Sequence, residues 1–153
     1  MAARPKSLID YVTFRLNVLT DIAHQNATAV YLKACGVSLR ELRVLRYAEI
    51  EPGLLQGRLA SLIYVEKTLV SKMVTSLAGR GLLLRKIGEN DARNVTLWLT
   101  PEGQNVVDIC DPIGRRLERE MMAVLSADER RLFKQCIEKV TDGLIAEREK
   151  LEK

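Results

Sequence analysis

The sequence has few of the residues on which metal and catalytic sites depend. Its 153 residues include one histidine, His24, and three widely spaced cysteines, Cys35, Cys110 and Cys136. Three such cysteines fit neither a disulfide framework nor a zinc-ligand pattern, and no cluster of carboxylates stands out as a metal site. Catalytic Ser/His/Asp or Cys/His arrangements and phosphate-binding glycine loops are also missing, so we predict no enzyme activity, no metal and no cofactor.

Long hydrophobic runs are missing as well. No stretch reaches the roughly 18 apolar residues that a membrane-spanning helix requires, so no membrane partner is expected. The start of the chain, Met1–Lys6, carries a basic cluster without the apolar core of a secretory signal, and we expect a cytoplasmic protein. Composition and length are those of an ordinary soluble chain that folds as one domain over 1–153.

The charge of the chain is mildly positive and unevenly placed. A net charge of +4 permits a nucleic-acid partner without arguing for one. Residues 65–100, however, hold six basic side chains and only three acidic ones, which is most of the excess positive charge. The position of this charge therefore says more about a partner than its total.

Two long helical segments frame the sequence. Residues 7–35 lack proline and contain apolar side chains at three- and four-residue steps up to Cys35-Gly36. Residues 101–153 hold two further helices, which begin at the cap Thr100-Pro101 and at the capping box Ser126-Ala-Asp-Glu129, and Pro112 is expected to kink the first of them. Such long terminal helices exceed what a small globule needs and suggest helices that hold two subunits together.

The middle of the chain, 36–100, has a different pattern. A capping box at Ser38-Leu-Arg-Glu41 opens one helix, a short helix is expected over 55–62, and a third over 66–78. The periodicity then falls to two for strands over 82–87 and 95–99, which flank a polar turn. Two short helices followed by a hairpin predict a winged helix-turn-helix, in a mainly α fold with a small β-hairpin wing.

The helix over 66–78 has the two faces that a recognition helix requires. One side is apolar, and the other carries lysines that can reach phosphates or guanine acceptors and short hydroxyl side chains that allow a close approach to base edges. The residues of this polar side are Lys67, Thr68, Ser71, Lys72 and Thr75. We add Gln56 of the preceding helix as a phosphate contact, Arg85 of the first strand, and Arg93 of the hairpin tip as a minor-groove contact. A merely solvated helix face is the alternative.

Several of these motifs resemble the MarR family of multiple-antibiotic-resistance-type regulators. The resemblance is carried by Leu59-Ala60, the helix over 65–77, Arg80-Gly81-Leu82 and above all the run Asp91-Ala-Arg-Asn-Val-Thr-Leu-Trp-Leu-Thr-Pro-Glu-Gly103. It covers 36–104 by motif and the whole chain by layout. Ala92 departs from the family pattern, which often has a second basic residue there.

The resemblance implies a homodimeric regulator that binds double-stranded DNA at a pseudo-palindromic operator, commonly as a repressor. Asp91 would brace the wing by pairing with an arginine, and Arg93 would enter the minor groove. The helices 7–35 and 101–153 would form the dimer and 36–100 the DNA-binding lobe. A small effector, often an aromatic carboxylate or its thioester, would bind between them. The side chains whose placement suits such a cleft are Tyr11, Arg15, His24 and Arg43.

Two other functions remain open from the sequence. A redox-responsive regulator could use Cys35 or Cys110, although relatives that sense oxidants use a cysteine near the start of the first helix, where this chain has none. A winged-helix module that binds protein would need an apolar patch in place of the basic face, and Lys67 and Lys72 argue against it.

Overall fold

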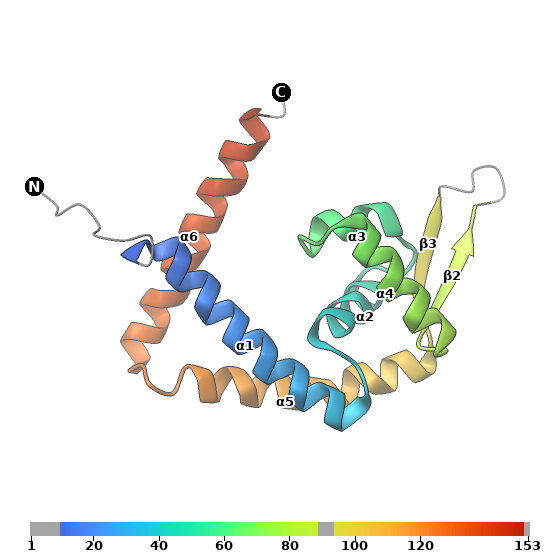
Figure 1. Ribbon diagram of the computed structural model, residues 1–153, viewed down its shortest axis with the longest axis horizontal. Helices are drawn as coiled ribbons and strands as arrows, with labels where there is room; N and C mark the ends of the chain where they lie inside the picture. Colours follow the sequence, from blue (N-terminus) through green and yellow to red (C-terminus); the bar gives the residue numbers. More distant parts are fainter. Residues whose placement is uncertain (1–9, 89–93, 152–153) are drawn as a thin grey trace, which may run out of the picture. The chain divides into compact units, whose positions relative to one another are not determined.

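The computed structural model describes residues 10–88 and 94–151 of the chain. They form a mainly helical fold with one small antiparallel sheet, as predicted (Figure 1). None of the helices in this part of the chain has the length and apolar character needed to cross a bilayer. The elements are α1 (Val12–Cys35), α2 (Leu39–Ile50), β1 (Leu54–Leu55), α3 (Gln56–Leu62), α4 (Lys67–Gly79), β2 (Leu83–Ile87), β3 (Val95–Leu99), α5 (Pro101–Met121) and α6 (Ala127–Leu151).

The chain divides into two compact units, Met1–Arg115 and Arg116–Lys153. The core of the first unit lies among α2, α3, α4 and the sheet, where Leu42, Leu45, Leu59, Leu77 and Leu97 are almost fully buried. The capping box of α2 is present as predicted, because the Glu41 amide donates to Ser38 Oγ at 3.2 Å and the Ser38 amide donates to Glu41 Oε2 at 2.8 Å. These reciprocal bonds satisfy two amides that the helix start would leave unpaired.

Helix α1 is long and little buried. It starts at Val12, five residues later than expected, and ends at Cys35, where the Gly36 amide donates to the Leu32 carbonyl at 3.0 Å. Only Tyr31, near its end, is buried. Its earlier apolar side chains are exposed in the single chain, among them Val12, Phe14, Val18, Leu19 and Ile22.

The sheet contains a strand that the sequence did not predict. Strands β2 and β3 pair over five positions from Leu83–Leu99 to Ile87–Val95, and β1 adds a third strand through Leu54–Leu97 and Leu55–Thr96. Gly53 makes the entry to β1 possible, since its φ is +86° and a Cβ there would lie 3.0 Å from the Trp98 ring. Two residues are too few to show the alternation by which strands are recognised.

The start of α5 is fixed by its cap and by a close approach to the wing. Thr100 Oγ1 accepts from the Gly103 amide at 3.0 Å and donates to the Gly81 carbonyl at 2.7 Å, which confirms the predicted N-cap. A Cβ at Gly103 would lie 2.1 Å from the Leu82 carbonyl oxygen and 2.7 Å from Leu99 Cδ1. Glycine at position 103 therefore allows helix and sheet to touch. The helix then continues through Pro112 to Met121.

This contact gives a stability prediction. We expect Gly103→Ala to lower the free energy of unfolding by about 3 kcal/mol, because the added methyl group overlaps a backbone carbonyl that cannot rotate away. Gly79→Ala is the matched control, since a Cβ at Gly79 meets nothing within 4 Å. Urea denaturation followed by circular dichroism measures both, and an equal effect of the two substitutions would contradict the argument.

The second unit contains the end of α5 and all of α6. The predicted capping box is present, with the Glu129 amide donating to Ser126 Oγ at 3.3 Å and the Ser126 amide to Glu129 Oε2 at 2.8 Å. These bonds to Ser126 hold the pKa of Glu129 below its ordinary value. No described residue of α6 is buried. Its exposed apolar side chains include Ile137, Val140, Leu144 and Leu151, which repeat at three-, four- and seven-residue steps along one side of the helix.

Candidate nucleic-acid interface and the adjoining cleft

Helix α4 has the two faces that the sequence predicted. Its apolar side is buried within the lobe of residues 36–100 and consists of Val70, Met73, Val74 and Leu77. The opposite side borders an open surface depression lined by Thr68, Ser71, Lys72, Thr75 and Ser76. Four of these five belong to the polar face predicted from the sequence. Ser76 was missed, although it lies four residues after Lys72 and so shares its side of the helix.

The basic groups of this face are available to a partner. Lys67 and Lys72 are exposed, and no ion pair to either lysine occurs within residues 10–88 and 94–151. The first turn of α4 contains no acidic residue. Both ammonium groups can therefore pair with phosphates.

An ion pair fixes the far end of α4. Arg80, which follows the helix, pairs with Glu41 through Nη1 and Oε1 at 3.2 Å and donates from Nη2 to the Gly36 carbonyl at 2.7 Å. Ser76 Oγ also donates to Glu41 Oε1, at 3.5 Å. The Glu41 carboxylate that caps α2 thus also anchors the end of α4.

Gln56 and Arg85 lie in the same lobe but are partly buried. Gln56 begins α3, and Arg85 stands opposite Leu97 in the sheet. Gln56 Oε1 and Arg85 Nε are both buried without a hydrogen-bond partner among the described residues. A buried polar atom left unpaired costs about 1–3 kcal/mol, so both side chains have an atom that a partner could satisfy.

The structure describes both strands of the wing, β2 and β3. Lys86 Nζ lies 4.5 Å from the centre of the Trp98 ring, and Trp98 Nε1 donates to Thr96 Oγ1 at 3.2 Å. This cation–π contact ties the two strands together on their exposed side. Asp91 and Arg93, the predicted wing contacts, lie outside the described residues.

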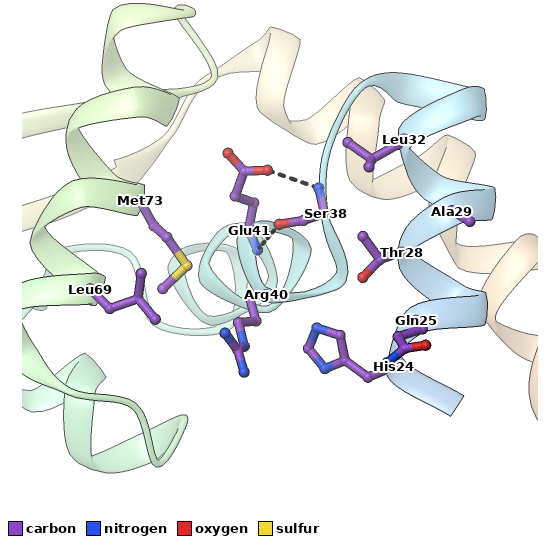
Figure 2. Close-up of a pocket in the computed structure, with 10 residues that line it drawn as sticks. All are labelled: His24, Gln25, Thr28, Ala29, Leu32, Ser38, Arg40, Glu41, Leu69 and Met73. Atoms are coloured by element: carbon purple, nitrogen blue, oxygen red, sulfur yellow. Dashed lines mark hydrogen bonds between the residues drawn. The ribbon is translucent and has the colours of Figure 1, made fainter. Parts of the chain in front are cut away.

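A cleft of about 520 Å³ opens beside α4, between this helix, α1 and the start of α2 (Figure 2). This volume falls in the range of small-molecule sites. Its lining combines apolar side chains from α1 and α4 with polar and charged ones, and the His24 imidazole lies beside the Arg40 guanidinium (Figure 2). The lining residues are His24, Gln25, Thr28, Ala29, Leu32, Ser38, Arg40, Glu41, Leu69 and Met73.

Two guanidinium groups act on the imidazole of the cleft, whose lining also includes the Glu41 carboxylate. Burial lowers the pKa of His24 below 6.5, and the positive charges of Arg40 and Arg43 lower it further, against the opposing effect of Asp21. The imidazole is therefore mainly neutral at pH 7. A bound anion would offset the positive charge of the two guanidinium groups and would raise the pKa of His24.

Of the four side chains predicted to line a ligand cleft, His24 lines this cleft. Arg43 acts on His24 through its charge without lining the cleft. Tyr11 and Arg15 are exposed at the beginning of α1. They lie roughly 20 Å and 14 Å along the helix from His24, at about 1.5 Å per residue. Arg40, Leu69 and Met73 also line this cleft but were not predicted to, because the sequence alone does not show that α1, α2 and α4 border one depression.

Comparisons with known proteins agree with this architecture. The model of the MarR family matches residues 37–95. The transcriptional regulator HosA of Escherichia coli is 33% identical over 97 residues, which are 63% of this chain and 72% of that protein. The PcaV regulator of Streptomyces coelicolor, solved with its natural ligand, is 25% identical and superposes with a TM-score of 0.74 over 93% of this chain and 98% of its own. The MepR–DNA complex of S. aureus has the same fold, with a TM-score of 0.77, 20% identity and coverage of 87% and 98%.

Proposed function

Because the chain belongs to the MarR family of transcriptional regulators, we propose that it binds a pseudo-palindromic DNA operator as a homodimer and represses transcription until a small anionic ligand releases it. The observation that carries the DNA-binding part is the exposed hydroxyl and lysine face of α4, beside the wing. Repression requires only that the bound dimer covers promoter DNA.

The α4 face suits the major groove. Its 13 residues make a rod of about 20 Å, and a single helix fits the groove width of about 12 Å. Thr68, Ser71 and Thr75 are short enough to bring the helix close to base edges, while Lys67 and Lys72 reach the phosphates on either side. In this proposal Gln56 and Arg85 contact the DNA backbone. Asp91 braces the wing, and Arg93 enters the minor groove. MepR, which has this fold, was solved in complex with DNA.

The exposed apolar sides of α1 and α6 support the homodimer. Rows such as Ile137, Val140 and Leu144 leave apolar surface in water unless a second helix covers it. A second copy of the same chain offers the same rows, and a twofold arrangement would present two α4 faces to two half-sites.

Fluorescence anisotropy on the promoter-side DNA flanking the chain's own gene tests the DNA-binding part. We expect tight binding that weakens steeply as salt rises, because lysine–phosphate contacts release counterions. Binding to this fragment should exceed binding to random DNA, and Arg93→Ala should weaken it. If variants of the α4 face bound random DNA as the wild type does, the proposal would fail.

The cleft beside α4 supports the ligand part. In this cleft an aromatic anion would find apolar side chains such as Leu32 and Leu69 together with Arg40 and His24. PcaV, at 25% identity, was solved with a natural ligand bound. A ligand releases DNA only by binding the DNA-free conformation more tightly. Leu69 and Met73 belong to α4 itself, so a ligand that moves them also moves the DNA-binding face.

Benzoate, as a simple aromatic carboxylate, gives a pH prediction for this cleft. Its affinity should rise as the pH falls from 8 to 5.5, because a bound carboxylate favours the protonated form of His24, whose pKa is lowered in the free protein. Isothermal titration calorimetry measures this, and His24→Ala should flatten the profile. Arg40→Ala should weaken binding about fivefold to tenfold at any pH in this range.

Two comparison variants sharpen the test. Lys33→Ala removes an exposed cation from the last turn of α1 and should leave benzoate affinity unchanged. Arg15→Ala determines whether the beginning of α1 also contributes, as the sequence suggested. An affinity that stays constant with pH and is indifferent to Arg40→Ala would remove the cleft as the anion site.

A further inference from the structure

Two thiols that are far apart in the sequence meet in the first unit. Cys35 is the last residue of α1 and Cys110 lies in the middle of α5, yet their Sγ atoms are 2.7 Å apart. A covalent disulfide bond measures about 2.05 Å. The separation lies between that of a covalent bond and that of an ordinary non-bonded sulfur contact, so the two sulfur atoms face each other within reach of a bond. Cys35 Sγ also contacts the Tyr31 carbonyl, at 3.3 Å.

The surroundings fix this contact between α1 and α5. A Cβ at Gly114 would lie 2.8 Å from the Tyr31 hydroxyl, so the two helices approach each other closely beside the thiols. Next to Cys110, Asp111 accepts from Arg46 of α2 at 3.0 Å. Pro112 has no amide proton and so removes one helix hydrogen bond from the turn that contains Cys110. The thiols thus meet where α1 and α5 are closely packed.

The two thiols differ in access and acidity. Cys35 is partly exposed, whereas Cys110 is fully buried. Burial, followed by the hydrogen bond with Cys35, raises the pKa of Cys110 to about 12. Cys110 therefore stays a protonated thiol at neutral pH, and an oxidant from solution meets Cys35 first.

A metal site does not explain the pair. Within the described ranges, no three His, Cys, Asp or Glu side chains are close enough to hold an ion. A simple packing contact between two small apolar side chains would explain their burial, but it would not require the sulfur atoms to point at each other.

We propose that Cys35 and Cys110 form a redox site, at which a hydroperoxide drives a reversible intramolecular disulfide that links the end of α1 to the middle of α5. In the first step the Cys35 sulfur takes one oxygen from the hydroperoxide ROOH, which leaves as ROH, and Cys35 becomes a sulfenic acid. In the second step the Cys110 sulfur attacks the Cys35 sulfur and its proton leaves with the hydroxyl group as water. A thiol reductant restores both cysteines.

Hydrogen peroxide added to the purified full-length chain tests this site, and the readout does not depend on DNA binding. Free thiols should fall from three to one in the wild type and from two to none in Cys136→Ser, with a loss of about 2 Da and a Cys35–Cys110 peptide in the digest. Dithiothreitol should reverse the change. Because the link closes a long loop, the melting temperature of the oxidised form should rise by about 5 °C or more.

Cys35→Ser and Cys110→Ser separate this site from other thiol chemistry. Each variant should fail to form the intramolecular disulfide. If removal of the buried Cys110 prevents folding, Cys35→Ser still tests the site. Oxidation of Cys35 to a sulfinic acid with Cys110 still free would overturn the proposal. So would a disulfide found only between Cys136 residues of two chains, or three unchanged thiols after peroxide treatment.

Discussion

Replacing both lysines of the α4 face, as Lys67→Ala/Lys72→Ala, should weaken operator binding about 10- to 100-fold at moderate salt. Each lysine is exposed and unpaired among the described residues, so replacing it should break no contact within the fold. The whole effect of the substitution should therefore fall on the contact with phosphate. A dimer loses each contact twice. The slope of log affinity against log salt should therefore become shallower by about 2 to 4, at about 0.9 for each phosphate contact.

The control for this pair must remove the same charge from elsewhere. Lys33→Ala/Lys150→Ala takes two exposed lysines from the ends of α1 and α6, outside the lobe of residues 36–100. It lowers the net charge equally and should leave both the affinity and the salt slope close to wild type. Anisotropy titrations at four salt concentrations compare the two double variants. Equal losses would mean that total charge, and not the α4 face, governs binding.

Local signals in the sequence predicted most of the elements. The capping boxes at Ser38 and Ser126 and the cap at Thr100 marked three helix starts to within a residue, because their hydrogen bonds close within a single turn. The two faces of α4 followed from helical periodicity alone. Family membership confirms the predicted regulator class, and with it the prediction that the chain is not an enzyme.

Features that join distant segments could not be predicted in this way. Strand β1 exists only because Leu54 and Leu55 meet β3, more than forty residues later. The cleft draws on α1, α2 and α4, so a sequence argument reached His24 but not Arg40 or Met73. The thiol pair is the extreme case, because its members are 75 positions apart. Spacing along the chain carries no information about contacts of this kind.

Charged substitutions in the apolar row on α6 are expected to have the largest effect on oligomeric mass and operator affinity. Val140→Glu/Leu144→Glu should convert the proposed dimer of twice 17.3 kDa to a monomer. Two carboxylates placed in an apolar helix–helix contact lose their hydration without gaining partners, a cost that the contact cannot offset. Multi-angle light scattering measures the mass, and circular dichroism checks that α6 stays helical.

Operator binding should fall with the dimer. A monomer reads one half-site and loses the effective concentration that the linked second lobe provides, which is worth about 10²- to 10⁴-fold in affinity. Ala146→Glu is the matched control, because Ala146 lies about 120° or more around α6 from this row and is also exposed. It adds a carboxylate to the same helix and should change neither mass nor affinity. A double variant that remained dimeric and bound its operator normally would show that α6 does not join the subunits, and would leave α1 to do so.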